Sequence, residues 1–181
     1  MDVAILERSF RLRSEYDVTA PGMTMVAQKA FFSLLTTIEL KDAGGDLIAT
    51  LQSEPSFVTK YRFELADGRD YDFHTGKFGT GVYVCEGSGG PYTYYQHRGL
   101  RASIFQQDRQ IAALSKNRFV MGDGNEYDVQ MNRDADLTLV VCMVLAMNTA
   151  DGNDRNDETF TIDFGNLLFE DRAFDESWTP N

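Results

Sequence analysis

The densest mixture of aromatic and basic side chains is found in PYTYYQHRGLR, residues 91–101. Guanidinium groups bind phosphate or carboxylate groups through paired hydrogen bonds, and aromatic rings stack against cations. An ordinary strand with one solvent-exposed face fits the same composition and is the alternative interpretation. The side chains that could form a ligand-binding patch are Tyr94, Tyr95, His97, Arg98 and Arg101.

A second group of chemically capable residues surrounds a possible turn at Asp67-Gly68. Asp70, Asp72 and His74 follow within a few positions. Carboxylates gathered in this way could hold Ca²⁺ or another hard cation, or serve an enzyme as acids and bases. The alternative is a plain turn, because Asp-Gly suits the backbone conformations that tight turns require.

Other catalytic and metal-binding patterns are not found in the sequence. Two histidines and two cysteines are scattered without the spacing of zinc ligands. Ser88 lies in GSGG, which is not the Gly-x-Ser-x-Gly elbow of hydrolases. The acidic run 151–158 fails as a calcium loop, because Arg155 stands at a ligand position. We therefore expect a protein that is not an enzyme, with no catalytic residue, metal site or cofactor. A carboxylate-based enzyme is kept as an alternative.

One apolar element must organise the fold around these residues. The run LTLVVCMVLAM, residues 137–147, is longer than the four to eight residues of a typical buried strand. As a helix it would cover roughly 16 Å, against a membrane core of about 30 Å. We predict a buried helix over about 135–150. Asn132 or Asp134 is the expected N-cap and Gly152 the expected stop.

The sequence before this helix has the pattern of a hairpin meander. Turn sequences recur, including DAGG at 42–45, DG at 67–68 and GDG at 122–124. Between them lie short segments in which apolar and polar residues alternate, as in Tyr61, Phe63 and Leu65. Residues 23–35 are ambiguous between strand and helix.

Composition limits the classes of function. The chain has 181 residues, of which 43% are hydrophobic, and a net charge of −11. Such a charge argues against nucleic acid as a partner, since phosphate binding depends on cationic side chains. Two cysteines form no disulfide framework, and MDVAILERSF does not have the pattern of a secretory signal. We expect a cytoplasmic protein without a transmembrane segment.

These elements together predict a mostly β fold, a closed antiparallel β-barrel wrapped around a central hydrophobic C-terminal helix. We assign residues 1–150 to this barrel. Residues 151–181 carry nine acidic and two basic side chains, a net charge of −7. We expect this acidic C-terminal extension to belong to the same domain. It should contain one added strand around Phe160, Ile162 and Phe164, and then a loose tail.

Strand–turn–strand units and an acidic lead-in to an apolar helix follow one another over roughly residues 15–150. The segments are TIELKDAGGDLIATL, KYRFELADGRDYDF, RASIFQQDRQIAALSK, RFVMGDGNEYDVQM and DADLTLVVCMVLAMNTA. The order of these motifs resembles the LURP-one-related family, within the tubby C-terminal-like superfamily that includes phospholipid scramblases. The resemblance implies a closed barrel around the helix.

The resemblance also implies a modest set of functions. Tubby domains bind phosphoinositides on a basic outer surface, and scramblase-like members are linked to lipid. No stretch of this chain matches the motif of that phosphoinositide site. We therefore expect a non-enzymatic binding or interaction module. Its partner is a protein or a lipid headgroup, with a peripheral phospholipid- or phosphoinositide-binding role as the alternative. The oligomeric state stays open.

Overall fold

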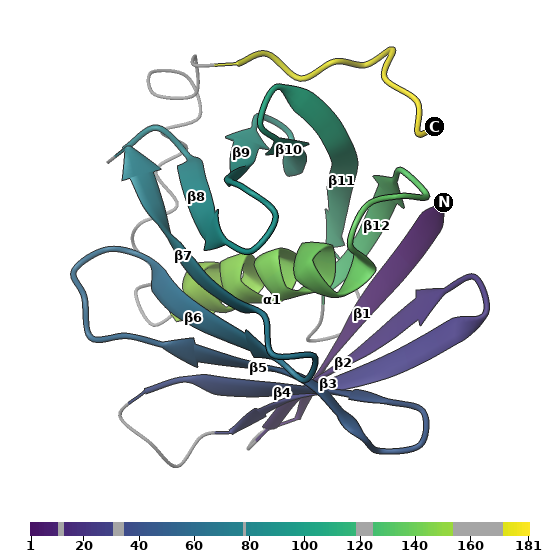
Figure 1. Cartoon of the computed structure of the whole chain (residues 1–181), viewed down its shortest axis with the longest axis vertical. Helices are drawn as coiled ribbons and strands as arrows, with labels where there is room; N and C mark the ends of the chain where they lie inside the picture. The colour runs from purple at the N-terminus through teal and green to yellow at the C-terminus, as the bar shows by residue number, and fades with distance from the viewer. Residues whose placement is uncertain (11–12, 31–34, 78, 119–124, 154–171) are drawn as a thin grey trace.

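The computed structural model describes residues 1–10, 13–30, 35–77, 79–118, 125–153 and 172–181 (Figure 1). Within these residues, twelve antiparallel strands form one closed barrel and one helix packs against them. The strands follow one another around the barrel in chain order. The strands are β1 (Asp2–Phe10), β2 (Arg13–Ala20), β3 (Met23–Ala30), β4 (Thr37–Asp42), β5 (Leu47–Ser53), β6 (Lys60–Leu65), β7 (Asp70–Lys77), β8 (Val82–Gly87), β9 (Tyr92–His97), β10 (Arg101–Gln106), β11 (Arg109–Arg118) and β12 (Asn125–Met131).

Alternating side chains explain why these segments form the wall of a barrel. In β12, Tyr127, Val129 and Met131 are buried, whereas Asp128 and Gln130 between them are exposed. Successive side chains of a strand point to opposite faces, so one series fills the interior and the other meets water. The predicted closed antiparallel barrel is therefore confirmed.

The barrel is closed by pairing between its first and last strands. In the β1–β12 ladder, Val3 lies opposite Val129 and Ile5 lies opposite Tyr127. The Met131 amide donates a hydrogen bond of 2.9 Å to a main-chain oxygen at the start of the chain. Closure satisfies the backbone groups that an open sheet would leave exposed at its edges.

Helix α1 (Leu137–Asn153) runs through the middle of the barrel (Figure 1). Every side chain from 139 to 147 is at most 3% exposed, so this stretch has no solvent-facing side. Valine is a mediocre helix former, and burial against the strands must therefore hold the helix. The predicted central helix is confirmed.

The start of α1 differs from the prediction. The Leu139 amide donates a hydrogen bond of 3.1 Å to Asp136 Oδ1, which makes Asp136 the N-cap. Asp134 instead forms a paired ion bridge with Arg109, at 2.7 and 3.0 Å. Asn132 is buried, and its side-chain amide donates to the Gln110 carbonyl oxygen of β11 at 3.1 Å. The prediction that Asn132 or Asp134 caps the helix was wrong, because three capping residues lie within five positions.

The element bounds correct one further expectation and decide one open alternative. Gly152 lies within α1 and does not stop it at residue 150. The ambiguous stretch 23–35 is a strand over its first eight residues, which are β3, and residues 31–34 lie outside the described part of the chain. The added strand predicted at 160–164 also lies outside the described residues.

No helix in the part of the chain that the structure describes is long and apolar enough to cross a lipid bilayer.

Candidate ligand-binding surface

The candidate patch lies on the hairpin of β9 and β10. His97, the last residue of β9, is paired opposite Arg101, the first residue of β10. Two left-handed residues, Gly99 with φ of 75° and Leu100 with φ of 59°, let the chain reverse between them. Directly opposed residues of an antiparallel pair share one face, so His97 and Arg101 are neighbours on the outside of the barrel.

Of the five predicted site residues, Tyr94 lies on the interior face of the hairpin and the other four do not. Tyr94 is 4% exposed and its ring packs edge-on against Tyr83, 6.1 Å away, on the interior face. Tyr95 follows it and therefore faces outward with His97. This placement corrects the grouping, because two adjacent tyrosines of a strand cannot share a face. Tyr95, His97, Arg98 and Arg101 remain as the outer group.

The last ten described residues, 172–181, are here called the C-terminal segment, and they lie against this outer group. In Figure 1 the segment is the yellow trace that passes the β9–β11 side of the barrel. The Phe174 ring meets the His97 ring edge-on at 5.3 Å, and the Arg101 guanidinium stacks on Phe174 at 4.6 Å. The Glu176 carboxylate accepts a hydrogen bond from Arg101 and forms an ion pair with it. The stretch that we expected to be a loose tail thus contacts the candidate patch.

A second stacked cation joins the same two parts of the chain. The Arg172 guanidinium lies 4.0 Å from the centre of the Phe105 ring and 5.5 Å from that of Tyr95. Phe105 and Ser103 belong to the outward series of β10, yet they are 7% and 2% exposed. The C-terminal segment and its neighbours therefore shield a strip of the outer wall from water.

The far end of the C-terminal segment is attached through its main chain. The Asn181 amide donates to Asn132 Oδ1 at 2.8 Å, and the Arg133 amide donates to a main-chain oxygen of Asn181 at 3.3 Å. Between the two ends, the Ser177 amide and hydroxyl both donate to Asp175. These hydrogen bonds lower the pKa of Asp175 and shape a turn within the segment.

The electrostatics of the patch depend on arginine rather than histidine. Burial, and secondarily the charge of Arg101, lower the pKa of His97 from 6.5 to about 4. The His97 Nε2 atom lies 2.7 Å from Ser103 Oγ, so the neutral ring has a hydrogen-bond partner. A cavity of about 470 Å³ lies between the hairpin and the C-terminal segment, with Arg98, Arg101 and Arg172 around it. At neutral pH these guanidinium groups supply its positive charge.

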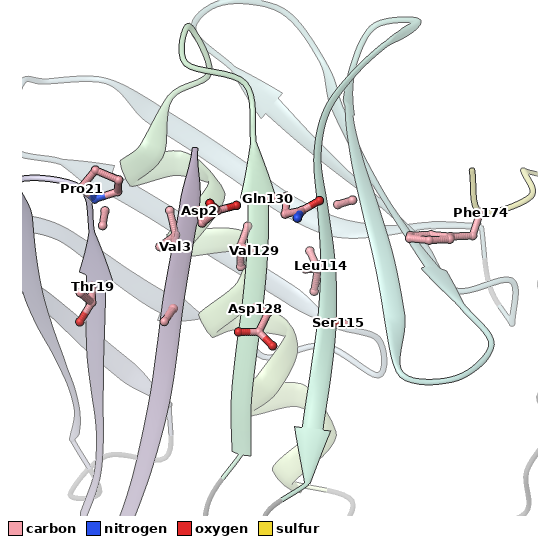
Figure 2. Close-up of a pocket in the computed structure, with 13 residues that line it drawn as sticks. Asp2, Val3, Thr19, Pro21, Leu114, Ser115, Asp128, Val129, Gln130 and Phe174 are labelled. Carbon is pink, nitrogen blue, oxygen red and sulfur yellow. The ribbon is translucent and has the colours of Figure 1, made fainter. Parts of the chain in front are cut away.

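A larger hollow of about 810 Å³ lies on the outer wall over β1, β2, β11 and β12 (Figure 2). Small side chains such as Ala4 and Ala113 form part of its lining, and Asp2 and Asp128 add carboxylates. Phe174 of the C-terminal segment borders one side. Among the described residues that line the hollow there is no basic side chain, so its charge does not favour an anionic ligand.

The acidic residues around Asp67 are paired with arginines. Arg69 Nε donates to Asp67 at 2.8 Å, which holds the pKa of this carboxyl below its usual value. Asp70 is bridged by Arg62 at 3.2 Å. Asp72 lies on the exposed face of β7. In the described ranges, no three histidine, cysteine or acidic side chains come close enough to share a metal ion.

The last member of that predicted group, His74, lies on the same strand. Its Nε2 atom is 3.8 Å from a Glu86 carboxylate oxygen on β8. Its Nδ1 atom is 3.2 Å from the Thr75 carbonyl oxygen. These neighbours place His74 at the outer surface of the barrel.

Sequence reasoning missed a buried polar cluster near the end of α1. Asn125 Nδ2 donates to Glu7 at 2.5 Å, and Asn148 Nδ2 donates to the Tyr16 hydroxyl at 3.0 Å. The Tyr127 hydroxyl donates to Asn148 Oδ1. Burial raises the pKa of Tyr16 to about 12, so its hydroxyl keeps its proton. These bonds fix one end of the helix to β2 and β12 and join β12 to β1, because a buried amide is costly without partners.

The fold and the candidate site define a class of protein, a twelve-stranded antiparallel barrel filled by a helix and carrying a cationic, aromatic outer hairpin. Comparison with models of protein families, with curated proteins and with solved structures found no match. The resemblance to the LURP-one-related family therefore rests on the order of the sequence motifs.

Proposed function

We propose that this protein is a non-enzymatic binding module that takes an acidic peptide segment of a partner protein on its β9–β10 hairpin. The observation that carries the proposal is the environment of Arg101. Its guanidinium binds the Glu176 carboxylate while its flat face stacks on the Phe174 ring. A guanidinium held in this way recognises a carboxylate and an aromatic ring together.

Charge supports a peptide rather than a membrane as the ligand. The chain carries a net charge of −11, which repels an anionic bilayer over distances near the Debye length. The neighbouring hollow adds Asp2 and Asp128 on the outer wall. A short peptide can reach Arg98, Arg101 and Arg172. Unlike a bilayer, it does not bring a large anionic surface close to the acidic residues of the hollow.

The test is direct binding of a peptide by the full chain. The peptide is a fluorescently labelled copy of residues 170–181, and fluorescence anisotropy gives its dissociation constant. We expect salt-sensitive binding, weakened about tenfold in the variant Arg98→Ala/Arg101→Ala, because losing an exposed ion pair and a cation–π stack together removes roughly 1–2 kcal/mol. Equal binding by this variant and the wild type would show that the hairpin is not the site.

Two controls make the result specific. Arg62→Ala removes an exposed arginine of β6 that bridges Asp70 and Glu64, and it should leave peptide binding unchanged. Co-sedimentation with neutral and with phosphoinositide-containing vesicles, at low and high salt, tests the lipid alternative. Selective pelleting with the phosphoinositide vesicles, together with no peptide binding, would move the function to lipid headgroups.

A further inference from the structure

We infer that the C-terminal segment is a resident occupant of the binding surface, which a partner peptide must displace. This inference rests on the proposed function, because it concerns the regulation of the same hairpin. The proposed function needs only that the hairpin binds acidic peptides. The inference adds that the chain supplies its own competing ligand. This ligand raises the concentration of partner peptide that is needed for binding.

The contacts of the segment indicate which kind of peptide fits. Arg172 and Phe174 are half-buried against the barrel, and Ala173 between them is exposed. Glu176 is exposed and reaches Arg101 from the turn that begins at Asp175. Contacts at alternate positions are typical of an extended chain lying on a surface. The surface therefore fits a peptide with an extended Arg-x-Phe stretch, followed by a turn that presents a glutamate to Arg101.

The stacking is reciprocal between the two parts. Arg101 of the barrel stacks on Phe174 of the segment, and Arg172 of the segment stacks on Phe105 of the barrel. Each side thus offers a cation and at least one aromatic ring to the other. A competing peptide must reproduce both stacks, and this requirement provides selectivity over a merely acidic sequence.

The contacts between Arg101 and Glu176 are weak enough for a competing peptide to break. The Glu176 side chain is 73% exposed and that of Arg101 is 33% exposed. Ion pairs in such positions are weak and are screened by salt. The main-chain hydrogen bonds that join the segment to the barrel lie at Asn181, away from Arg101. The Arg172–Glu176 part can therefore leave the hairpin without breaking a strand ladder.

Covalent attachment gives the segment an advantage over free peptides. Residues 154–171 connect it to α1, so it competes as an intramolecular ligand. An attached ligand acts at an effective concentration on the order of a millimolar. If its intrinsic dissociation constant is near 100 μM, the attached segment weakens an added peptide about tenfold.

The experiment releases the segment in the full-length chain. Phe174→Ala/Glu176→Ala removes the ring and the carboxylate that meet Arg101. Thr179→Ala is the matched control, since it changes an exposed residue of the same segment and keeps those contacts. The charge reversal Glu176→Arg, which opposes Arg101, is a second way to release the segment. Circular dichroism verifies that each variant is folded.

Two readouts follow the released segment. The single tryptophan of the chain, Trp178, lies in the segment and is half-buried, so its fluorescence reports docking. Release should shift its emission to the red and increase its quenching by acrylamide. The labelled copy of residues 170–181 should bind the released variants about tenfold more tightly than wild type or the control variant.

The outcomes separate the two claims. If peptide affinity is equal in wild type and released variants, yet is lost in Arg98→Ala/Arg101→Ala, the competing-segment inference is overturned and the proposed function stands. If tryptophan exposure increases without a gain in affinity, the segment docks without competing and the inference is again overturned. If no variant binds the peptide, the proposed function itself fails.

Discussion

At the scale of single residues, the environment of His97 makes a pH dependence predictable. Its ring is half-buried against Phe174 and Ser103, Arg101 adjoins it, and its pKa in the folded chain is about 4 against 6.5 in the unfolded chain. Arg98, Arg172 and Glu176 line the same cavity.

The pKa of His97 sets a pH window for this effect. Between about pH 4 and pH 6.5, the histidine is protonated in the unfolded chain but not in the folded chain. The stability contributed by neutral His97 is therefore present above about pH 6.5 and is lost as the pH falls towards about 4.

The measurement compares urea unfolding of wild type and His97→Gln across this pH window. Glutamine is uncharged at every pH, so the variant should lose less stability on acidification than the wild type does. An NMR titration of the wild type supplies the second test. A His97 resonance that titrates near its ordinary value in the folded protein would contradict the argument.

At the scale of elements, α1 makes the clearest prediction. Val141 is 0% exposed at the middle of the helix, inside the closed wall. Val141→Asp should prevent folding, because an unpaired buried carboxylate costs several kcal/mol or more. Val141→Ala is the control and should fold with a loss of roughly 1–3 kcal/mol, since it removes only two buried methyl groups. Heteronuclear NMR spectra of the two variants check this. A native spectrum from soluble Val141→Asp would show that the helix is not enclosed.

The elements with strong periodic patterns could be predicted from the sequence. The run 137–147 is too long for a strand and too short to span a membrane, and it lies within α1, which is buried over residues 139–149. Alternation at Tyr61, Phe63 and Leu65 gave the inward face of β6. The boundaries were weaker, because Asn132, Asp134 and Asp136 can each cap a helix and the sequence cannot choose among them.

The site was less predictable than the fold for two physical reasons. Tyr94 and Tyr95 are adjacent and equally apolar. The alternation of apolar and polar residues therefore does not show which of the two points inward, and Tyr94 was not recognised as the buried one. The contact between Arg101 and Glu176 joins positions 75 residues apart, and no local pattern encodes such a pairing. The inward position of Glu7 did have a signal, because it continues the alternation of Val3 and Ile5 along β1.

At the scale of the whole molecule, the closed wall makes the helix and the barrel depend on each other. No strand in the described residues is left at a sheet edge, because β1 pairs with β12. The buried polar cluster ties Asn148 of α1 to residues of β2 and β12. Opening of the wall and release of the helix should therefore be one cooperative event.

The two cysteines of the chain test this cooperativity, since Cys142 lies on the enclosed helix and Cys85 faces the interior from β8. Burial raises the pKa of both thiols, that of Cys85 to about 12, and the reactive thiolate is scarce in the folded state.

A thiol reagent should therefore modify both cysteines at the same slow rate and with the same urea dependence, because each reaction requires global opening. Mass spectrometry of peptides from Cys85→Ala and Cys142→Ala measures the two rates separately. Faster modification of Cys85 would mean that the wall opens around β8 while the helix stays in place, and the barrel would then be two cooperative units rather than one.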